Sequence, residues 1–433
     1  MFQTIKNAWK IDDLRKKIVF ALFILLLYRI GAQIPVPFLT ADLATSMNEQ
    51  TAGSILQYMN ILSGGAFSQA TLFALGISPY ITASIVIQLL TVAIPPLERL
   101  AKEGEDGKKK LNQITRYVTV ALALLTAVGY YFMLRGYDYL TDTGAFAAVV
   151  IIACYCAGSS LVMWLAEKIN ESGIGNGISL ILFANIVSRG PSIVATLWNY
   201  AAGNIEGTPQ WLGIIIAVAS VIIGILMVML IVFITNSERR LPVQYAKKVV
   251  GRKMYGGQNS TLPIKLNNTG VMPIIFASSI VSIPATIGLF VDYHDSAFWT
   301  GFFNLFDSGS VVYAILTFLL IIAFAYFYIL ISFNPVEVSN NLKKNGGSIP
   351  GIRPGKPTSD YIKRVLNRIT LIGAIFLGFI AVFPMVINLV SGGKMAGLAF
   401  GGSSIIIVVG VIIETAREIE GQMTMRHYKG FLE

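Results

Sequence analysis

Ten long apolar segments limit what this chain can fold into more than any other feature of its sequence. They cover roughly residues 18–34, 70–94, 114–134, 145–166, 178–198, 211–235, 271–291, 311–333, 369–390 and 398–413. A helix crosses the hydrocarbon core of a bilayer with about 20 apolar residues, and most of the segments reach that length. With 55% hydrophobic and only 13% charged residues, the sequence predicts an all-α membrane protein with ten transmembrane helices.

The basic residues between these segments are distributed unevenly. Of the 33 lysines and arginines, 29 lie in the N-terminal segment, the tail and the loops on one side of the predicted membrane. Only Arg135, Arg189 and Lys394 lie on the other side, and Arg29 lies within the first apolar segment. Positive charge is retained in the cytoplasm. We therefore expect a multi-pass protein of the cytoplasmic membrane with both termini and the large loops in the cytoplasm.

Residues 53–94 join an apolar piece too short to span with one that is long enough. Residues 54–63 are bounded by Gly53 and by Gly64-Gly65. As a helix they would reach roughly 15 Å, about half of the hydrocarbon core. A half-length helix ahead of a span predicts a re-entrant element, which survives at membrane depth only inside protein or against a water-filled cavity. A short helix on the membrane surface is the alternative.

Two nine-residue pieces follow one pattern at a separation of 194 residues. GISPYITAS (76–84) opens the second span and GVMPIIFAS (270–278) opens the seventh. If the chain consists of two five-span halves, 1–200 and 201–433, the odd number of spans makes them inverted repeats. We expect the shared proline to remove one helical donor and the glycine to let backbones approach.

Aliphatic side chains recur on one helix face in these spans. Ile77 and Ile81 lie four residues apart. Ile178 and Leu182 repeat this spacing, and Ile275 stands where the repeat places Ile81. The span interiors lack the acidic residue that ion-coupled carriers usually keep. These side chains either form a hydrophobic constriction, closed to ions by dewetting, or face lipid and neighbouring helices.

Two long basic loops, 236–268 and 334–365, lie on the predicted cytoplasmic side. Gly256-Gly257 and the run GGSIPGIRPGKP give them tight tips that present Arg252-Lys253 and Arg353 outward. Such tips favour docking of a polyanion such as ribosomal RNA, or of an acidic protein surface. A solvated loop that only fixes the topology would account for the charge but not for the tips.

The sequence offers no constellation for catalysis, a metal or a cofactor. Its two histidines, His294 and His427, lie outside the apolar segments. Cys154 and Cys156 would point about 200° apart on a helix, so they form no shared metal site. GIRPGKPT departs from a phosphate-binding loop because Pro350 replaces the first required glycine. We expect a protein that is not an enzyme.

Taken together, several long motifs in order resemble the SecY family, the central subunit of the bacterial Sec protein-conducting channel. They are IPVP, SGGAFSQATLFALGISPYITASIVIQLLT, KEGEDGKKKLNQITRY, ESGIGNGIS, LPIKLNNTGVMPIIFASSI, FNPVEVSNNLKKNGGSIPGIRPGKPT and FGGSSIIIVVGV. The match covers essentially the whole chain. It implies two inverted five-helix halves, hinged between the fifth and sixth spans, and a re-entrant half-helix plug over about 54–67.

The resemblance also implies roles for residues at matching positions. An aliphatic ring would close the pore: Ile77, Ile81, Ile178, Leu182, Ile275 and Ile407. The plug would contain Ile55, Leu56, Met59, Ile61, Leu62, Gly64 and Gly65. A lateral gate would open between spans two and three and spans seven and eight, with Gln88, Asn267 and Ser278 as candidate polar residues.

The partners that the resemblance implies are proteins, RNA and lipid. The loop tips Arg239, Arg240, Arg252, Lys253 and Arg353 would dock the SecA motor ATPase and the ribosome. SecE and SecG would be small membrane subunits, and signal sequences, nascent polypeptides and membrane lipids would meet at the gate. A passing polypeptide would be driven by SecA or by the ribosome.

A secondary transporter with inverted repeats is the alternative. It requires a compact polar or charged site at mid-membrane, and the sequence shows none. A structural scaffold for membrane assembly would leave the half-length helix without a role.

Overall fold

The computed structural model describes most of the chain. The described residues are 8–40, 59–60, 62–203, 209–245, 248–250, 253–255, 259–267, 269–288, 299, 301–302, 305–306, 310–390 and 401–429. Three of the plug residues named above, Ile55, Leu56 and Ile61, therefore lie outside them, and so does Arg252.

Helices account for most of the described residues. In chain order they are α2 (Asp12–Gly31), α5 (Ser78–Ala93), α6 (Pro95–Lys102), α7 (Glu105–Gly136), α8 (Ala145–Ser172), α9 (Gly177–Ser188), α10 (Gly190–Ala202), α11 (Gln210–Asn236), α12 (Met272–Val281), α13 (Ile283–Gly288), α15 (Val311–Ser332), α16 (Pro335–Lys344), α17 (Lys356–Val390) and α19 (Gly401–Lys429). Each of the ten predicted apolar segments contains a helix.

Within the part of the chain that the structure describes, six helical stretches are long and apolar enough to cross a membrane, or seven if the bent pair α5–α6 counts as one span. They begin at Glu105, Ala145, Gly177, Gln210, Val311 and Lys356. The second predicted span differs from the expectation, because residues 63–77 form turns and the helix begins only at Ser78. Left-handed backbone at Ala70 (φ 45°) and Gly76 (φ 55°) interrupts any helix over this stretch.

The seventh predicted span, 271–291, is also shorter as a helix than expected. α12 has only 10 residues and ends at Val281, and α13 starts after Ser282. Ser282 and Ser279 donate their hydroxyls to backbone carbonyls of the preceding turn, and Pro284 follows two residues after Ser282. A proline three residues beyond a helix end is incompatible with an uninterrupted ladder of hydrogen bonds.

The two basic loops form one small sheet, which the sequence did not predict. β1 (Glu238–Tyr245) pairs antiparallel with β4 (Asn259–Lys265), with Leu241 opposite Leu262. The second loop supplies β5 (Gly347–Ser348), which pairs with the end of β1, so the strand order is β4-β1-β5. β2 (Lys248–Val250) and β3 (Lys253–Tyr255) form a separate hairpin beyond it.

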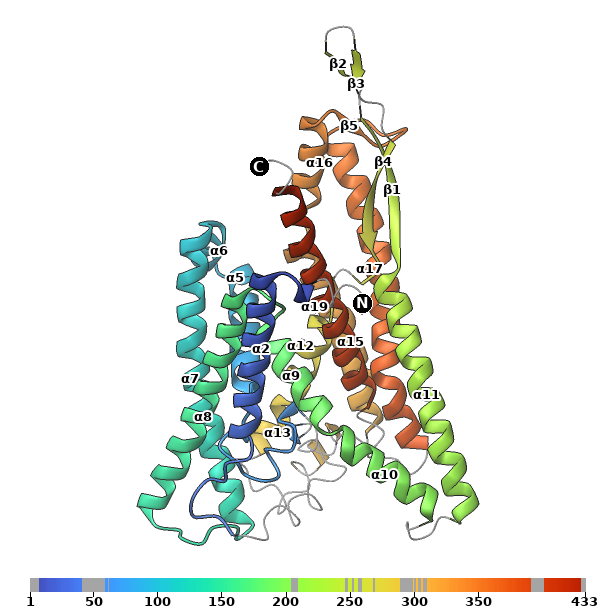
Figure 1. Ribbon diagram of the computed structural model, residues 1–433. Helices are drawn as coiled ribbons and strands as arrows, with labels where there is room; N and C mark the ends of the chain where they lie inside the picture. The colour runs from blue at the N-terminus through green and yellow to red at the C-terminus, as the bar shows by residue number, and fades with distance from the viewer. Residues whose placement is uncertain are drawn as a thin grey trace.

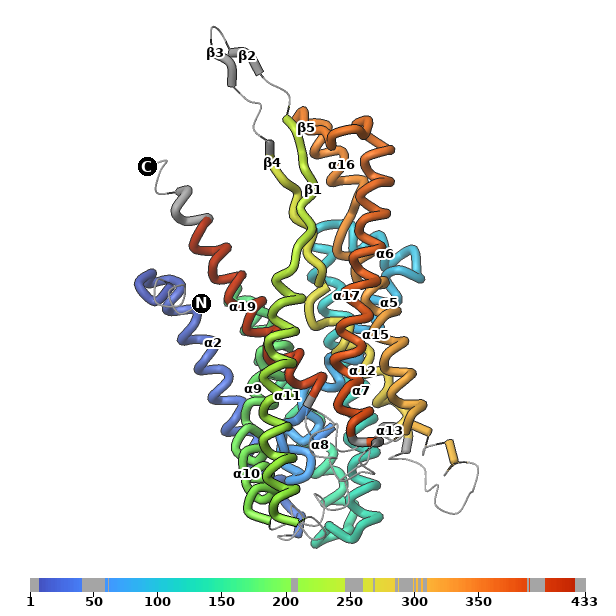
Figure 2. The backbone as a smooth tube through the Cα atoms, turned by 90° about the vertical axis from the view of Figure 1, so that its right-hand side faces the viewer, coloured from blue at the N-terminus to red at the C-terminus, as the bar shows by residue number. Residues whose placement is uncertain are grey.

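The helices form two groups that meet along α9 and α19 (Figure 1). α2, α5, α7 and α8 lie in one group, and α11, α15 and α17 lie in the other. The sheet lies beside α16 and the start of α17, at the end of the molecule where α2 begins and α19 ends (Figure 2). The basic loops and the helix ends nearest the termini therefore share one side, as the charge distribution predicts.

One hydrophobic core crosses from one group to the other. Its buried side chains come from α2, α5, α8, α9, α11, α12, α15, α17 and α19. Burial of aliphatic surface in such a core is non-directional, so it joins the groups without fixing one orientation by hydrogen bonds. A separate core under the sheet includes Leu241, Val243, Ile264 and Ile362.

Candidate functional site

The six aliphatic residues predicted to form a ring lie in this shared core. Ile77 caps α5, Ile81 lies in its first turn, Ile275 lies in α12, and Ile407 lies in α19. Ile178 and Leu182 come from α9. Five of them are buried, and Ile178 is half-buried against the core.

The helices that carry these residues pack in pairs across the two groups. α5 contacts α12, and α9 contacts α19. The aliphatic side chains therefore meet where the two groups of helices face each other. Such side chains offer ions neither hydrogen bonds nor charge.

The segment before α5 is a compact turn built on two glycines. Gly64 (φ 68°) and Gly65 (φ 92°) both take left-handed backbone. The amide of Gly65 donates to the Asn60 carbonyl at 2.9 Å, and the amide of Ser68 donates to Asn60 Oδ1 at 3.1 Å. Met59 and Leu62 are buried beside it. The two glycines predicted to belong to the plug thus lie in a hydrogen-bonded turn.

A cleft of about 440 Å³ opens between the helices predicted to form the lateral gate. Met59 and Leu75 line it on the side of the turn. The gate helices supply the other lining residues: Ser78, Pro79 and Thr82 of α5, Leu122, Leu125 and Thr126 of α7, Ser279 of α12, Ser282, and Ile283 and Ile287 of α13. The lining is mostly apolar, which suits an apolar helical segment better than a polar solute.

The polar residues predicted for the gate do not line this cleft. Gln88 is half-buried and donates to Ser84 Oγ at 3.4 Å, within α5. Asn267 is buried and lines a different cavity, and Ser278 is buried within α12. The hydroxyl residues Thr82, Thr126, Ser279 and Ser282 line the cleft instead. Their spacing of three or four residues from other lining residues was the signal available in the sequence.

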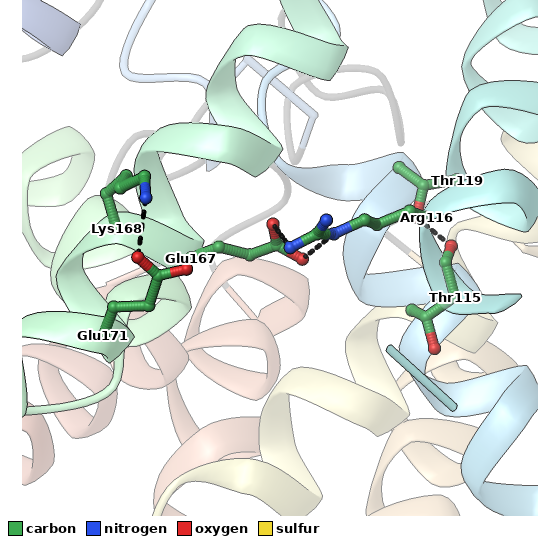
Figure 3. Close-up of polar contacts among 6 residues, drawn as sticks. All are labelled: Thr115, Arg116, Thr119, Glu167, Lys168 and Glu171. Atoms are coloured by element: carbon green, nitrogen blue, oxygen red, sulfur yellow. Dashed lines mark hydrogen bonds and ion pairs between the residues drawn. The ribbon is translucent and has the colours of Figure 1, made fainter. Parts of the chain in front are cut away.

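A bidentate ion pair joins the gate helix α7 to its neighbour α8 (Figure 3). Arg116 Nε donates to Glu167 Oε1 at 2.9 Å, and Arg116 Nη2 lies 2.8 Å from Glu167 Oε2. The Glu167 side chain is only 12% exposed, so screening by solvent is reduced. Two parallel bonds fix the orientation of the pair. α7 and α8 are therefore held as one unit.

The predicted docking residues lie on the sheet and on the turn after β5. Arg239 and Arg240 are exposed on β1, where Arg240 Nε donates to Glu238 Oε1 at 2.7 Å. Lys253 opens β3. Of the two β1 arginines, Arg239 has no ion pair among the described residues, so it is the more available for a partner.

Arg353 is exposed on a turn that the protein holds firmly. Its carbonyl accepts the Thr358 hydroxyl at 2.8 Å, and the Ser339 hydroxyl donates to the Gly355 carbonyl at 2.8 Å. Ile349, which is buried, and the half-buried Ile352 anchor the turn in the core beneath the sheet. The guanidinium is thus presented from a rigid base, which lowers the entropy lost on binding a partner.

A polar cavity of about 340 Å³ lies near the end of β4. Lys265, Glu414 and Arg417 line it. Burial, together with the charge of Arg417, lowers the pKa of the Lys265 ammonium. Arg417 Nη2 donates to the Thr235 carbonyl at 2.9 Å, which caps the end of α11. Among the described residues, no group of three His, Cys, Asp or Glu side chains could hold a metal ion.

Two solved structures share this fold. One described as the structure of a protein conducting channel has a TM-score of 0.65 at 19% identity, and the match covers 94% of this chain and 92% of that one. Sec61 in the canine ribosome-channel complex from the endoplasmic reticulum has a TM-score of 0.61 at 18% identity, with the same coverage. At this identity the likeness establishes the fold, and the ten-helix arrangement with a plug is confirmed.

Sequence relatives are much more similar. The protein translocase subunit SecY of Streptomyces coelicolor is 44% identical over 448 residues, and that of Mycobacterium tuberculosis is 42% identical over 452 residues. Both matches cover 100% of each chain. The SecY family model matches residues 71–416. Identity at this level along the whole length establishes that the chain belongs to the SecY family.

Proposed function

We propose that this protein is the channel subunit of a protein translocase. It passes unfolded secretory polypeptides across the cytoplasmic membrane and releases transmembrane segments sideways into lipid. The observation that carries the proposal is the aliphatic contact between α5, α9, α12 and α19. It offers a sliding peptide no strong hydrogen bonds, so a chain of any sequence can pass, while the closed contact excludes water and ions.

Opening requires the two groups of helices to separate. We assign them to an N-terminal half (1–200) and a C-terminal half (201–433). The cleft between α5, α7, α12 and α13 is the place where an apolar signal sequence enters. Such a segment replaces helix–helix contacts on one side and faces lipid on the other, which biases a two-state channel toward its open state.

The energy for transport comes from partners, because the protein is proposed to have no catalytic activity of its own. The relatives are named as translocase subunits, and solved neighbours are ribosome complexes. By analogy, SecA and the ribosome dock on Arg239, Arg353 and the basic hairpin on the cytoplasmic side. SecE and SecG are the small membrane subunits of the same complex.

The ring is tested by opening it. Replacing Ile81 and Ile275 together with Ser introduces hydroxyls into the constriction and shortens both side chains. We expect the resting conductance of the purified complex in planar bilayers to rise by about tenfold or more. The matched control replaces Ile222 and Ile225, which are exposed on α11, with Ser. Unchanged conductance in the ring variant would contradict the assignment.

The docking surface is tested by reversing one charge. Arg353→Glu should abolish most SecA-driven uptake of a secretory precursor into membrane vesicles, because a rigidly presented cation becomes an anion. The matched control is Arg135→Glu, which makes the same charge reversal at an exposed position in the last turn of α7. Equal uptake by the two variants would count against docking at Arg353.

A further inference from the structure

Asn185 of α9 joins three segments that are distant in the sequence. It is fully buried, and its Nδ2 donates to the Leu62 carbonyl at 2.6 Å and to the Tyr28 hydroxyl at 2.8 Å. A backbone carbonyl can only accept a hydrogen bond, so the atom facing Leu62 is the amide nitrogen. The side chain thus connects α9 to α2 and to residues 62–65, which we call the base of the plug.

The Leu62 carbonyl lies at the end of a helical turn, where no backbone amide of the same helix can donate to it. Carbonyls in the last turn of a helix have no intrahelical partner. Here the chain reverses at Gly64 and Gly65, and the Gly65 amide is already used by the Asn60 carbonyl. Asn185 supplies the missing donor from another helix. Without it, a buried carbonyl would lose its partner inside the membrane.

The space around Gly64 is filled by the same group of side chains. A Cβ at Gly64 would lie 2.8 Å from Arg29 Nη1 and 3.0 Å from Asn185 Oδ1. The guanidinium and the amide therefore flank the glycine on its side-chain face. Tyr28 also stacks on Phe73, with ring centroids 5.4 Å apart and planes 6° from parallel. The base of the plug is seated in α2 and α9 by specific contacts.

We propose that Asn185 is a positioning residue that latches the base of the plug in the closed channel. This inference rests on the channel function proposed above. Displacement of the base breaks the bond from the Asn185 amide to the Leu62 carbonyl, whereas the bond to the Tyr28 hydroxyl joins α9 to α2 and holds the amide in place. The latch therefore opposes leakage by keeping the base of the plug seated against α2 and α9.

The test compares variants that remove the donor with different changes in volume. Asn185→Leu keeps the branching at Cγ in a larger side chain but cannot donate, whereas Asn185→Ala cannot donate and leaves a cavity. Tyr28→Phe removes one partner and keeps the stack on Phe73. Asn112→Ala, at an exposed position of α7, is the control. All are made in a complete complex in which Cys154 and Cys156 are replaced by Ser and the buried Ala66 by Cys.

Two measurements are made on each variant: modification of Cys at position 66 by a water-soluble maleimide, and resting conductance in planar bilayers. A lost hydrogen bond of ordinary strength corresponds to about a fivefold to tenfold shift in an equilibrium. We expect Asn185→Leu and Asn185→Ala to raise both quantities by about that factor, and Tyr28→Phe to raise them less.

The latch is refuted if Asn185→Leu and Tyr28→Phe both behave like Asn112→Ala. It is also refuted if only Asn185→Ala responds, because a cavity then explains the effect. The double Ser variant of Ile81 and Ile275 is measured beside them. Leakage in that variant without an effect at Asn185 overturns the latch alone, whereas no leakage in either overturns the channel assignment as well.

Discussion

The two copies of the repeated pattern begin in the same way and continue differently. Gly76 (φ 55°) and Gly270 (φ 64°) are both left-handed. The next residues, Ile77 (φ −93°, ψ −2°) and Val271 (φ −89°, ψ −9°), cap α5 and α12 with nearly the same backbone angles. The proline follows in each first turn. α5 then runs for 16 residues, whereas α12 ends after 10.

The shared proline has a different role from the one expected. It does not remove a bonded donor, because Pro79 and Pro273 both lie in the first turn, where an amide has no intrahelical acceptor. Its fixed φ favours starting the helix directly after a left-handed glycine. The repeat thus encodes a helix start, which supports the assignment of two equivalent halves.

The contacts around the two copies differ, and they indicate whether α5 or α12 is held more rigidly. At the start of the N-terminal copy and in the turn just before it, the hydroxyls of Tyr130, Tyr155 and Ser159 donate to the carbonyls of Phe67, Ala70 and Gly76. In the C-terminal copy, Phe276 packs edge-to-face on Phe324 and Tyr328, with ring centroids 5.8 and 6.2 Å apart. Hydrogen bonds fix one geometry, whereas ring contacts tolerate sliding. We therefore expect α12 to move more than α5 when the gate opens.

The largest predicted effect comes from the glycines that face each copy. A Cβ on Gly158 would overlap the Leu72 carbonyl oxygen, which is backbone, whereas one on Gly410 would overlap a methyl of Val271. We expect Gly158→Ala to destabilise by about 3 kcal/mol or more and Gly410→Ala by about 1 kcal/mol. Thermal unfolding in detergent measures both. Equal effects would remove the proposed difference in rigidity.

A smaller effect is expected from the tyrosine that anchors the N-terminal copy. Tyr130→Phe leaves the Phe67 carbonyl without its 2.5 Å bond in a fully buried site, which costs about 1–3 kcal/mol. Tyr117→Phe, at a position that is 77% exposed, should change stability by less than about 0.5 kcal/mol. The same unfolding measurement applies, and a Tyr130 variant as stable as the Tyr117 variant would argue against anchoring by hydroxyls.

The smallest effect is expected from the repeated prolines. Pro79→Ala and Pro273→Ala should each change stability by less than about 1 kcal/mol, since a first-turn amide is tolerated there. The two values should agree, because the helix starts have the same geometry. A large loss at only one position would show that the two starts are not equivalent. Precursor uptake into vesicles checks that both variants remain functional.

Much of this fold could be predicted from the sequence, and particular residues explain where prediction stopped. Apolar length predicted the helices, and the distribution of lysine and arginine predicted that the basic loops and the helix ends nearest the termini share one side. The turn over 70–77 was missed because its apolar composition is that of a span, and left-handed backbone at Ala70 and Gly76 interrupts it. The length of an apolar segment does not predict where its backbone turns left-handed.

The candidate site was predictable only where its residues follow a local pattern in the sequence. The aliphatic residues follow helical spacing, so Ile77 and Ile81 could be placed on one face. The sheet was missed because β1 is joined to β5 across about a hundred residues, and long-range pairing leaves no local pattern. Asn185 was missed because a single asparagine in an apolar helix has no periodicity; its role depends on Leu62 and Tyr28, which only the fold brings near.

The central claim is that the polypeptide passes through the aliphatic contact between the halves. The direct measurement places a cysteine at Ile275 of α12 in a protein whose Cys154 and Cys156 are replaced by Ser. A precursor with a single cysteine is then arrested during transport, and disulfide formation is followed. We predict an adduct at position 275 only during arrest, and none from a cysteine at Ile225, which is 57% exposed on α11. Equal adducts at both positions, or none at 275, would contradict the account.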